Sequence, residues 1–340
     1  AEMKEAEKEV PIELKVAILL AQRNIYTFHK KQKFEGKKVE TMEGVTCWQK
    51  AVGIEKVGLY IPGGTAPLFS TVLMLAVPAK IAGCKEIVLC TPPNKEGKIN
   101  PAILYAAQVS GVSKIFKAGG VQAIGAMAYG TESVPKVYKI FGPGNQYVMA
   151  AKQQVSLHDV AIDMPAGPSE VCVIADEQAN IEFIAADLLS QAEHDKMATA
   201  VLITDDADFA QKVSDELEIQ IPQLPRAEIA RCSIDTNGKI IITDSLKKAL
   251  EVSNILAPEH LEICVDEPFR YLPKIRAAGS IFLGRYTPEP LADYMAGPNH
   301  VLPTGGTARF SSALSVDSFV KKSSYLYFGH EAFNSLADDV

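Results

Sequence analysis

Two side chains that could bind a metal ion lie three residues apart, where a predicted helix ends. Gln191 and His194 follow an apolar pattern from Ile181 to Leu189 whose period of about 3.6 residues is typical of an amphipathic helix. Residues three apart on a helix share a face, so an amide oxygen and an imidazole nitrogen can reach one ion. The same spacing is common on solvent-facing helices, and Gln is an infrequent zinc ligand. The pattern indicates either half of a metal site or an ordinary polar face.

A carboxylate and an imidazole are adjacent at a turn that precedes a predicted strand, in Pro258-Glu259-His260. Loop ends commonly carry catalytic groups, and these two side chains could accept protons as bases of different strength. An ordinary loop pair would leave the same sequence. Asp293 and His300 are further ligand-type residues, in a segment that Gly and Pro interrupt too often for a buried helix.

Several common catalytic patterns are missing from the sequence. It contains no H-E-x-x-H, no G-x-S-x-G and no complete G-x-G-x-x-G. The other three histidines, His29, His158 and His330, have polar or charged neighbours, and we expect them on the surface. The turn Gly142–Asn145 lies between a predicted strand and a predicted helix, where backbone N–H groups could bind a nucleotide phosphate. A tight turn that serves only the fold would look the same.

The composition indicates a globular protein of about two domains. The chain has 340 residues, 47% hydrophobic and 22% charged, and single cores rarely exceed about 300 residues. Asp and Glu outnumber Lys and Arg by 41 to 34, and the net charge of -7 argues against nucleic-acid binding. The apolar runs are too short to span a membrane. Because the six cysteines form no C-x-x-C pair, we expect reduced, mostly buried thiols.

Strands and helices are predicted to alternate in two successive runs, after a helical stretch over residues 1–34. The first run has strands 56–61, 86–90, 113–117 and 136–141 and helices 67–82, 102–109, 121–129 and 145–155. The second has strands 170–175, 200–204, 239–243, 261–265 and 280–283 and helices 181–194, 208–216 and 246–255, with a last helix that ends at residue 278. Such alternation is typical of parallel βαβ units. We therefore predict an α/β protein of two Rossmann-like domains with mostly parallel sheets.

Six ordered segments, which together reach from residue 60 to residue 304, resemble those of histidinol dehydrogenases. They are Tyr60–Gly64, Phe141–Asn145, Asp163–Glu170, Ser190–His194, Pro258–Leu261 and Gly297–Thr304. The resemblance runs along nearly the whole chain. It implies a zinc enzyme of histidine biosynthesis that oxidises L-histidinol to L-histidine through histidinaldehyde, with two NAD.

The resemblance also implies roles for ten residues of this chain. The family's zinc ligands match Gln191, His194 and Asp293. Its catalytic bases match Glu259, which would activate water, and His260, which would take the alcohol proton. Its substrate contacts match Ser169, Gln191, His194, His260 and Asp293, with His300 nearby. Its contacts to NAD match Tyr60, Gln122 and Asn145.

A domain division follows from the resemblance as well. Residues 1–59 and 169–312 would form a discontinuous domain with the zinc and catalytic residues, and residues 60–168 a second domain with the cofactor contacts. Residues 313–340 would begin a C-terminal tail, and the active site would lie in the cleft between the domains.

The resemblance further predicts a cytoplasmic homodimer whose active sites are shared between subunits. In the family a segment precedes the region that matches this chain, and a C-terminal tail follows it. That tail reaches the partner's site and carries a substrate-binding Glu and a fourth zinc ligand, a His. Neither residue occurs here, so we expect three protein ligands and weak zinc binding.

Two other functions are compatible with the motifs alone. A zinc hydrolase could use Glu259 to activate water, and a chain without the tail could fold and dimerise without binding metal. Formation of NADH from histidinol and NAD distinguishes the dehydrogenase from the hydrolase, and an equilibrium metal assay identifies the non-catalytic chain.

Overall fold

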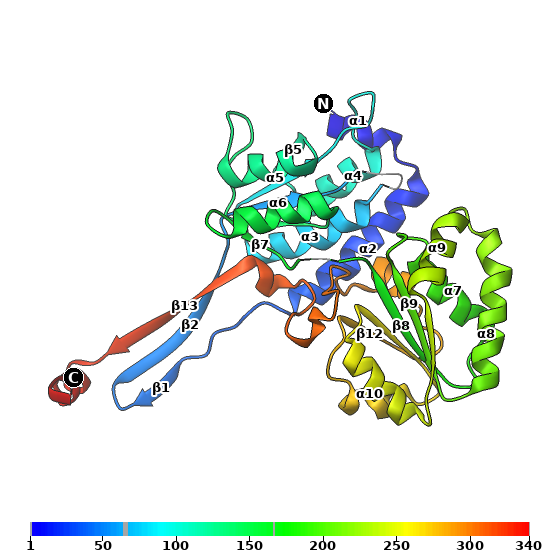
Figure 1. Ribbon diagram of the computed structural model, residues 1–340. Coiled ribbons are helices and arrows are strands. Elements are labelled where there is room, and N and C mark those ends of the chain that lie inside the picture. The colour runs from blue at the N-terminus through cyan, green and yellow to red at the C-terminus, as the bar shows by residue number, and fades with distance from the viewer. Residues whose placement is uncertain (1, 64–66, 166, 340) are drawn as a thin grey trace. The chain divides into compact units, whose positions relative to one another are not determined.

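A computed structural model describes residues 2–63, 67–165 and 167–339 (Figure 1). Gly64 and Ala166, which belong to two of the motifs, lie outside the described residues. The chain forms two units: unit 1 consists of residues 1–163 and 314–340, and unit 2 of residues 164–313. Each unit contains a parallel sheet with helices, so the predicted α/β class is confirmed.

This division differs from the predicted domains, which joined residues 1–59 to residues 169–312. Residues 1–59 belong to unit 1 because their helices pack on helices of that unit and because β3 (Lys56–Tyr60) is the middle strand of its sheet. Residues 314–340 are also part of unit 1, since β13 (Val320–Phe328) pairs with β2 (Val45–Gly53) along its length.

The parallel sheet of unit 1 has five strands in the order β5-β4-β3-β6-β7. Besides β3, they are β4 (Glu86–Thr91), β5 (Lys114–Lys117), β6 (Lys139–Phe141) and β7 (Ala161–Ile162). Gly58 is in register with Val88 on one side and Ile140 on the other. The direction of winding therefore reverses between β3 and β6, where sheets of this kind usually bind ligands.

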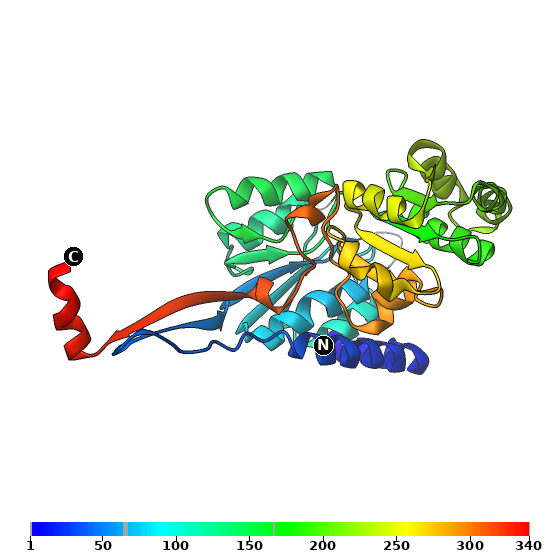
Figure 2. The same cartoon turned by 90° about the horizontal axis from the view of Figure 1, so that it is seen from below.

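Helices cover both faces of this sheet (Figure 2). One face carries α3 (Phe69–Ala82) and α4 (Pro101–Ser110), against which α1 (Glu2–Glu9) and α2 (Ile12–Lys30) pack. The other carries α5 (Gly120–Tyr129) and α6 (Gln146–Ser156). The N-terminal helical stretch is two helices because Pro11 has no N–H to continue α1 and its fixed φ suits the start of α2.

An antiparallel sheet of order β1-β2-β13 extends from the parallel sheet of unit 1 (Figure 1). It includes β1 (Val39–Met42), and the short helices η5 (Val316–Phe319), α12 (His330–Leu336) and η6 (Ala337–Asp339) flank β13. We call β1, β2, β13 and α12 the arm. Leu326, Tyr327 and Phe333 of the arm are 66%, 63% and 60% exposed. These strands were not predicted, because strands that bury neither face lack an alternating pattern.

The sheet of unit 2 repeats this winding, with five parallel strands in the order β10-β9-β8-β11-β12. They are β8 (Glu170–Ala175), β9 (Thr199–Thr204), β10 (Lys239–Ile242), β11 (His260–Cys264) and β12 (Ser280–Leu283). Helices α7 (Ile181–Ala192), α8 (Ala207–Gln220) and α9 (Ala227–Asn237) pack together, and α10 (Leu246–Leu256) packs on β8 and β9. Short elements complete the unit: η1 (Ile221–Gln223), η2 (Pro268–Lys274), α11 (Glu289–Leu291), η3 (Ala292–Ala296) and η4 (Thr307–Arg309).

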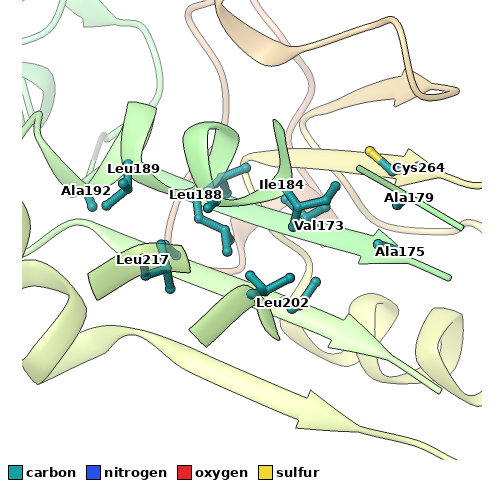
Figure 3. Packing of buried hydrophobic residues seen from close by; sticks show 14 of the residues in the cluster. Val173, Ala175, Ala179, Ile184, Leu188, Leu189, Ala192, Leu202, Leu217 and Cys264 are labelled. Atoms are coloured by element: carbon teal, nitrogen blue, oxygen red, sulfur yellow. The ribbon is translucent and has the colours of Figure 1, made fainter. Parts of the chain in front are cut away.

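The core of unit 2 fills the space between β8, β9 and α7 (Figure 3). Val173 and Leu202 of the strands meet Ile184 and Leu188 of α7, and all four are at most 2% exposed. Burying an aliphatic side chain of this size contributes about 1.5–3 kcal/mol. This packing fixes the rotation of α7, and with it the direction of the residues at its end.

Three predictions need correction. His29 is not on the surface but fully buried, with Nδ1 2.9 Å from Ile25 O. The helix α9 was not predicted, and the helix expected to end at residue 278 is the shorter 3₁₀ helix η2, in which Pro273 interrupts the hydrogen bonding.

In the described part of the chain, no helix is both long and apolar enough to cross a membrane.

Candidate active site

The adjacent bases lie where α10 leads into β11, at the amino end of that strand. α10 ends at Leu256, and Ala257 then has a left-handed backbone, with φ of 51°. Such a residue ends a helix and turns the chain, although for Ala it costs about 1–2 kcal/mol. Pro258 follows, and the turn brings Glu259 and His260 to the amino end of β11. Their side chains are buried there, and the two residues are 7% and 3% exposed.

Hydrogen bonds to the start of β8 hold Glu259 in place. Its Oε2 accepts from Glu170 N at 2.9 Å, and its own N donates to Glu170 Oε2 at 3.3 Å. The other oxygen of Glu170 accepts from Gly305 N at 3.0 Å. Burial raises the pKa of Glu259 to about 7, against the opposing effects of the charge of His260 and the backbone hydrogen bond. A carboxyl group with this pKa can exchange a proton near neutral pH.

His260 is held from both sides of its ring. Its Nδ1 lies 2.9 Å from Glu170 O, and because a carbonyl only accepts, Nδ1 carries the hydrogen. Its Nε2 lies 3.3 Å from Asp293 Oδ2. Burial lowers the pKa of His260, but the hydrogen bond with Asp293 and the negative charges around the ring outweigh it and raise the pKa to about 10.

Asp293 belongs to a third segment, the π-helical turn η3, a geometry that is frequent at functional sites. The nearest ligand-type atoms of His260, Glu289 and Asp293 all lie within 4.8 Å of one another. Glu289 is 4% exposed, and its Oε2 accepts from Ser190 Oγ at 3.0 Å. Sequence analysis did not identify Glu289; the available signal was an acidic residue between two prolines, four residues before Asp293.

The predicted metal pair, Gln191 and His194, lies at the carboxyl end of α7. Only Gln191 is part of the helix. α7 ends at Ala192, so Gln191 is in its last turn and His194 in the turn that follows, with His194 N donating to Gln191 O at 3.0 Å. Gln191 is 2% exposed, and among the described residues its Oε1 has no hydrogen-bond partner. A buried carbonyl oxygen without a partner is costly, and a bound cation would satisfy it.

The remaining candidates of unit 2 lie at the same end of its sheet. Burial lowers the pKa of His194, which the charges of His260 and Asp293 also influence. Burial likewise lowers the pKa of His300, on which Asp293 and His194 act, and its Nε2 is buried without a partner among the described residues. Ser169 directly precedes β8 and is half-buried. All seven predicted site residues of unit 2 thus lie at one end of its sheet, and their oxygen and nitrogen donors are of the kinds that bind Zn²⁺.

A second group of ligand-type side chains in unit 2 was also not predicted. Ligand-type atoms of Asp187, Glu262 and Cys264 lie within 4.8 Å of one another. Burial raises the pKa of Asp187 to about 6, and burial together with the neighbouring Asp187 raises that of Glu262 well above its ordinary value. The sequence signal was Glu262 itself, a carboxylate inside the aliphatic strand β11.

The three predicted NAD contacts lie in unit 1, around the carboxyl ends of its strands. Tyr60 ends β3 and is 3% exposed, and its hydroxyl accepts from Gly120 N at 3.0 Å. Gln122 is exposed in the first turn of α5. Asn145 caps α6, with Oδ1 accepting from Tyr147 N and Val148 N at 3.1 Å each. The site borders the reversal point between β3 and β6 and the amino ends of two helices, which suits an anionic dinucleotide.

Comparison with known proteins identifies the family. The family model for histidinol dehydrogenase matches residues 1–340. A histidinol dehydrogenase of Bacteroides fragilis is 66% identical over 322 residues, which are 95% of this chain and 75% of that protein. The crystal structure of histidinol dehydrogenase from Elizabethkingia anophelis is 51% identical, with a TM-score of 0.97, and the match covers 100% of this chain and 78% of that one.

A more distant likeness concerns the fold alone. An acetylating aldehyde dehydrogenase from Geobacillus thermoglucosidasius is 18% identical, with a TM-score of 0.62 over 96% of this chain and 90% of that one. From the family model and from relatives at such high identity, we conclude that the chain belongs to the histidinol dehydrogenase family, whose members are NAD-dependent oxidoreductases.

Proposed function

We propose that this protein oxidises L-histidinol to L-histidine through histidinaldehyde, using zinc and two NAD, in the cytoplasm. Family membership supports the reaction. The single observation in the structure that favours the metal is the buried, unpartnered Oε1 of Gln191, beside a group of acidic and imidazole side chains. A zinc hydrolase built on Glu259 has no comparable support, because the family is one of dehydrogenases.

The metal would be held by Gln191, His194 and Asp293. Gln191 offers an oxygen, His194 a neutral nitrogen favoured by its lowered pKa, and Asp293 a negative charge. When bound, zinc orients the substrate's amino and imidazole nitrogens and offsets nearby negative charge. Ser169 and His300, at the same end of the sheet, would contact the substrate.

His260 would take the proton of the alcohol as hydride leaves for NAD. The hydrogen on Nδ1, directed at Glu170 O, leaves Nε2 as the nitrogen that can accept a proton. The pKa of His260 is high because Asp293 and Glu259 are negative. It falls when the charge of Asp293 is neutralised, which makes Nε2 a base at neutral pH.

Glu259 would act in the second half of the reaction. An aldehyde gives up hydride only after water adds to its carbonyl, so a base must remove a proton from that water. Glu259 has a pKa of about 7, and its backbone hydrogen bond to Glu170 fixes its direction. The two bases therefore serve different half-reactions.

We also propose a homodimer with active sites shared between subunits. The arm supports this, because exposed apolar side chains on both β13 and α12 are typical of a surface that another chain covers. Tyr60, Gln122 and Asn145 would bind NAD at the reversal point of the unit 1 sheet.

The test is rapid-mixing absorbance of NADH with metal-loaded enzyme in excess over histidinol. The unaltered protein should form two equivalents of NADH. Glu259→Gln should form the first at a nearly normal rate and the second about 100-fold more slowly, the scale for losing a general base. Absence of NADH in the unaltered protein would reject the function, and equal slowing of both equivalents would reject the role of Glu259 in water activation.

A further inference from the structure

A buried ion pair in unit 1 has no part in the proposed chemistry. Lys152 of α6 forms an ion pair with Asp163, and the two side chains are 1% and 3% exposed. Lys139 contributes a second positive charge near Asp163, but its own Nζ donates to Ser318 O at 3.0 Å. Lys152 and Asp163 are therefore each other's partners in a place that excludes water.

Both members of the pair also bind the backbone of Gly142, one on each side of its Cα. Lys152 Nζ donates to Gly142 O at 2.7 Å, and Gly142 N donates to Asp163 Oδ2 at 2.6 Å. The two groups of Gly142 are thus fixed by opposite charges. Charge-assisted hydrogen bonds of this kind are about twice as strong as neutral ones.

Gly142 needs this fixation because its backbone is unusual. Its φ is +121°, and a Cβ on this residue would lie 2.0 Å from Tyr60 O. Only Gly permits that conformation and that approach, but Gly also has the greatest freedom to leave it. The ion pair selects one of the many conformations open to Gly142.

Gly142 is also the first residue of the loop that leads to Asn145. Gly142 follows β6, packs on the backbone of Tyr60, and is followed by Pro143 and Gly144 before Asn145 caps α6. Tyr60 is in turn joined to Gly120 N, two residues before Gln122. Gly142 therefore contacts the segment of Tyr60 and begins that of Asn145, and Tyr60 in turn contacts the segment of Gln122.

Stability alone does not account for a pair of this kind. Removing two charges from water costs about as much as their attraction returns, and well-packed apolar residues often replace buried ion pairs without loss. What such a pair can provide is a single conformation of the groups bonded to it. Here those groups are the N–H and C=O of Gly142.

We propose that Lys152 and Asp163 are positioning residues for the NAD site: together they clamp the N–H and the C=O of Gly142 and hold the loop from Gly142 to Asn145 in the conformation that binds NAD. The inference rests on the proposed function for the identity of the ligand. The clamp itself rests on the contacts of unit 1 alone.

The experiment compares NAD binding and amide hydrogen exchange in Lys152→Met and in the unaltered protein, both metal-loaded. Met keeps an unbranched apolar chain as far as the ε position and removes the ammonium group, and with it the charge and the donor. If only about one molecule in ten then has the loop in place, the dissociation constant for NAD rises about tenfold. Exchange at the Gly142 amide should accelerate, whereas zinc content and histidinol affinity should not change.

Leu104→Ala is the matched control. Leu104 is buried in α4, on the opposite face of the same sheet from α6, so its truncation lowers the melting temperature without touching the loop. NAD affinity should be kept in this variant. If it weakens NAD binding as much as Lys152→Met does at equal loss of stability, the ion pair is only structural and the proposal is wrong.

Asp163→Asn provides a second variant if Lys152→Met does not fold. Asn keeps an acceptor for Gly142 N and removes the partner charge of Lys152, so a smaller weakening of NAD binding is expected, with faster exchange at Gly142. Unchanged NAD affinity in a folded variant overturns the proposal. If the unaltered protein binds no NAD, the proposed function fails instead, and the exchange rate of the Gly142 amide still decides whether the clamp exists.

Discussion

The two parallel sheets share one winding order, but their candidate residues lie at opposite ends of the strands. We call the side of a sheet where its strands end the carboxyl edge, and the side where they begin the amino edge. In unit 1, Tyr60 is the last residue of β3, and Asn145 follows the carboxyl end of β6. In unit 2, Glu170 begins β8 and His260 begins β11, so the proposed catalytic groups stand at the amino ends. The general rule that such sheets bind ligands beyond their carboxyl ends holds for unit 1 only. The comparison shows that one topology offers two chemically different edges.

The difference between the edges lies in the helix termini that meet there. Helices begin at the carboxyl edge, where the positive ends of the dipoles of α5 and α6 favour anions such as phosphates. They end at the amino edge, where the free C=O groups of α7 and α10 favour cations. Gln191 in the last turn of α7 is therefore well placed for a metal, and Asn145 at the start of α6 for a dinucleotide.

The buried charges of the two units differ in the same way. Unit 1 buries the opposite charges of Lys152 and Asp163, which compensate each other. Unit 2 buries the carboxyl groups of Asp187 and Glu262, which can be accommodated only if they hold a proton. Unit 2 should accordingly lose stability as these carboxyl groups ionise at rising pH.

The largest expected effect comes from removing a metal ligand at the amino edge. His194→Ala should lower zinc affinity about 100-fold, since each of a few ligands supplies a large share of the binding energy. Equilibrium dialysis with metal analysis measures it. NAD affinity should not change, and His158→Ala, which alters an exposed histidine of unit 1, should retain the metal. One tightly bound zinc per chain in His194→Ala would remove this residue from the ligand set.

The next effect concerns the buried carboxyl groups of unit 2. Asp187 has a higher pKa folded, about 6, than its ordinary 3.8, so the folded chain binds the proton more tightly. Stability that is present below about pH 4 is then lost as the pH rises through 6. Asn at this position never ionises, so Asp187→Asn should be more stable than the unaltered protein at pH 8, by about 1–2 kcal/mol, and equal at pH 4.

Calorimetric melting at both pH values measures this effect. Glu177→Gln is the control, because Glu177 is exposed in the same unit and its loss should leave the pH dependence unaltered. A gain that is the same at pH 4 and pH 8 would show that packing, and not the ionisation of Asp187, causes it.

At the carboxyl edge, a substitution can separate the capping role of Asn145 from its role toward NAD. Asn145→Asp keeps the acceptor for Tyr147 N and Val148 N but adds a negative charge where the phosphates should bind. NAD affinity should fall about tenfold, the effect of about 1.4 kcal/mol, with no loss of stability. Asn145→Ala should lose a similar affinity and also about 1 kcal/mol of stability. Isothermal calorimetry with NAD and thermal melting separate these outcomes, and normal NAD binding by Asn145→Asp would place the cofactor elsewhere.

The smallest effect concerns helix ends. In unit 1, α3 and α4 end in left-handed Gly83 and Gly111, whereas α10 of unit 2 ends in left-handed Ala257. Ala257→Gly should therefore raise the free energy of unfolding by about 1 kcal/mol. Ala249→Gly, inside the same helix, should lower it by a similar amount or more. Denaturant unfolding measures both, and a destabilised Ala257→Gly would mean that the methyl group of this buried Ala is needed for packing.

Local patterns predicted most elements of both parallel sheets, because buried strands and amphipathic helices leave their periods in the sequence. The strands of the arm leave no such period, and the last predicted helix is only the short 3₁₀ helix η2 because Pro273 interrupts its hydrogen bonding. Within the site, residues such as Glu259, His260 and Asp293 could be identified from the sequence, because their side chains can bind metal or protons and they lie next to turns. Glu289 and Glu262 were not, because their significance depends on neighbours such as Ser190 and Asp187, about 100 and 75 residues away along the chain, which only the fold brings near.

The pairing of β13 with β2 has a consequence for biosynthesis. The whole of unit 2, residues 164–313, is inserted between the two strands of this pair. A ribosome that adds about 5–20 residues per second completes β13 roughly 15–55 seconds after β2. During that time β2 is an open edge that could pair with another nascent chain, so the order of synthesis favours unit 2 folding first and the arm closing last.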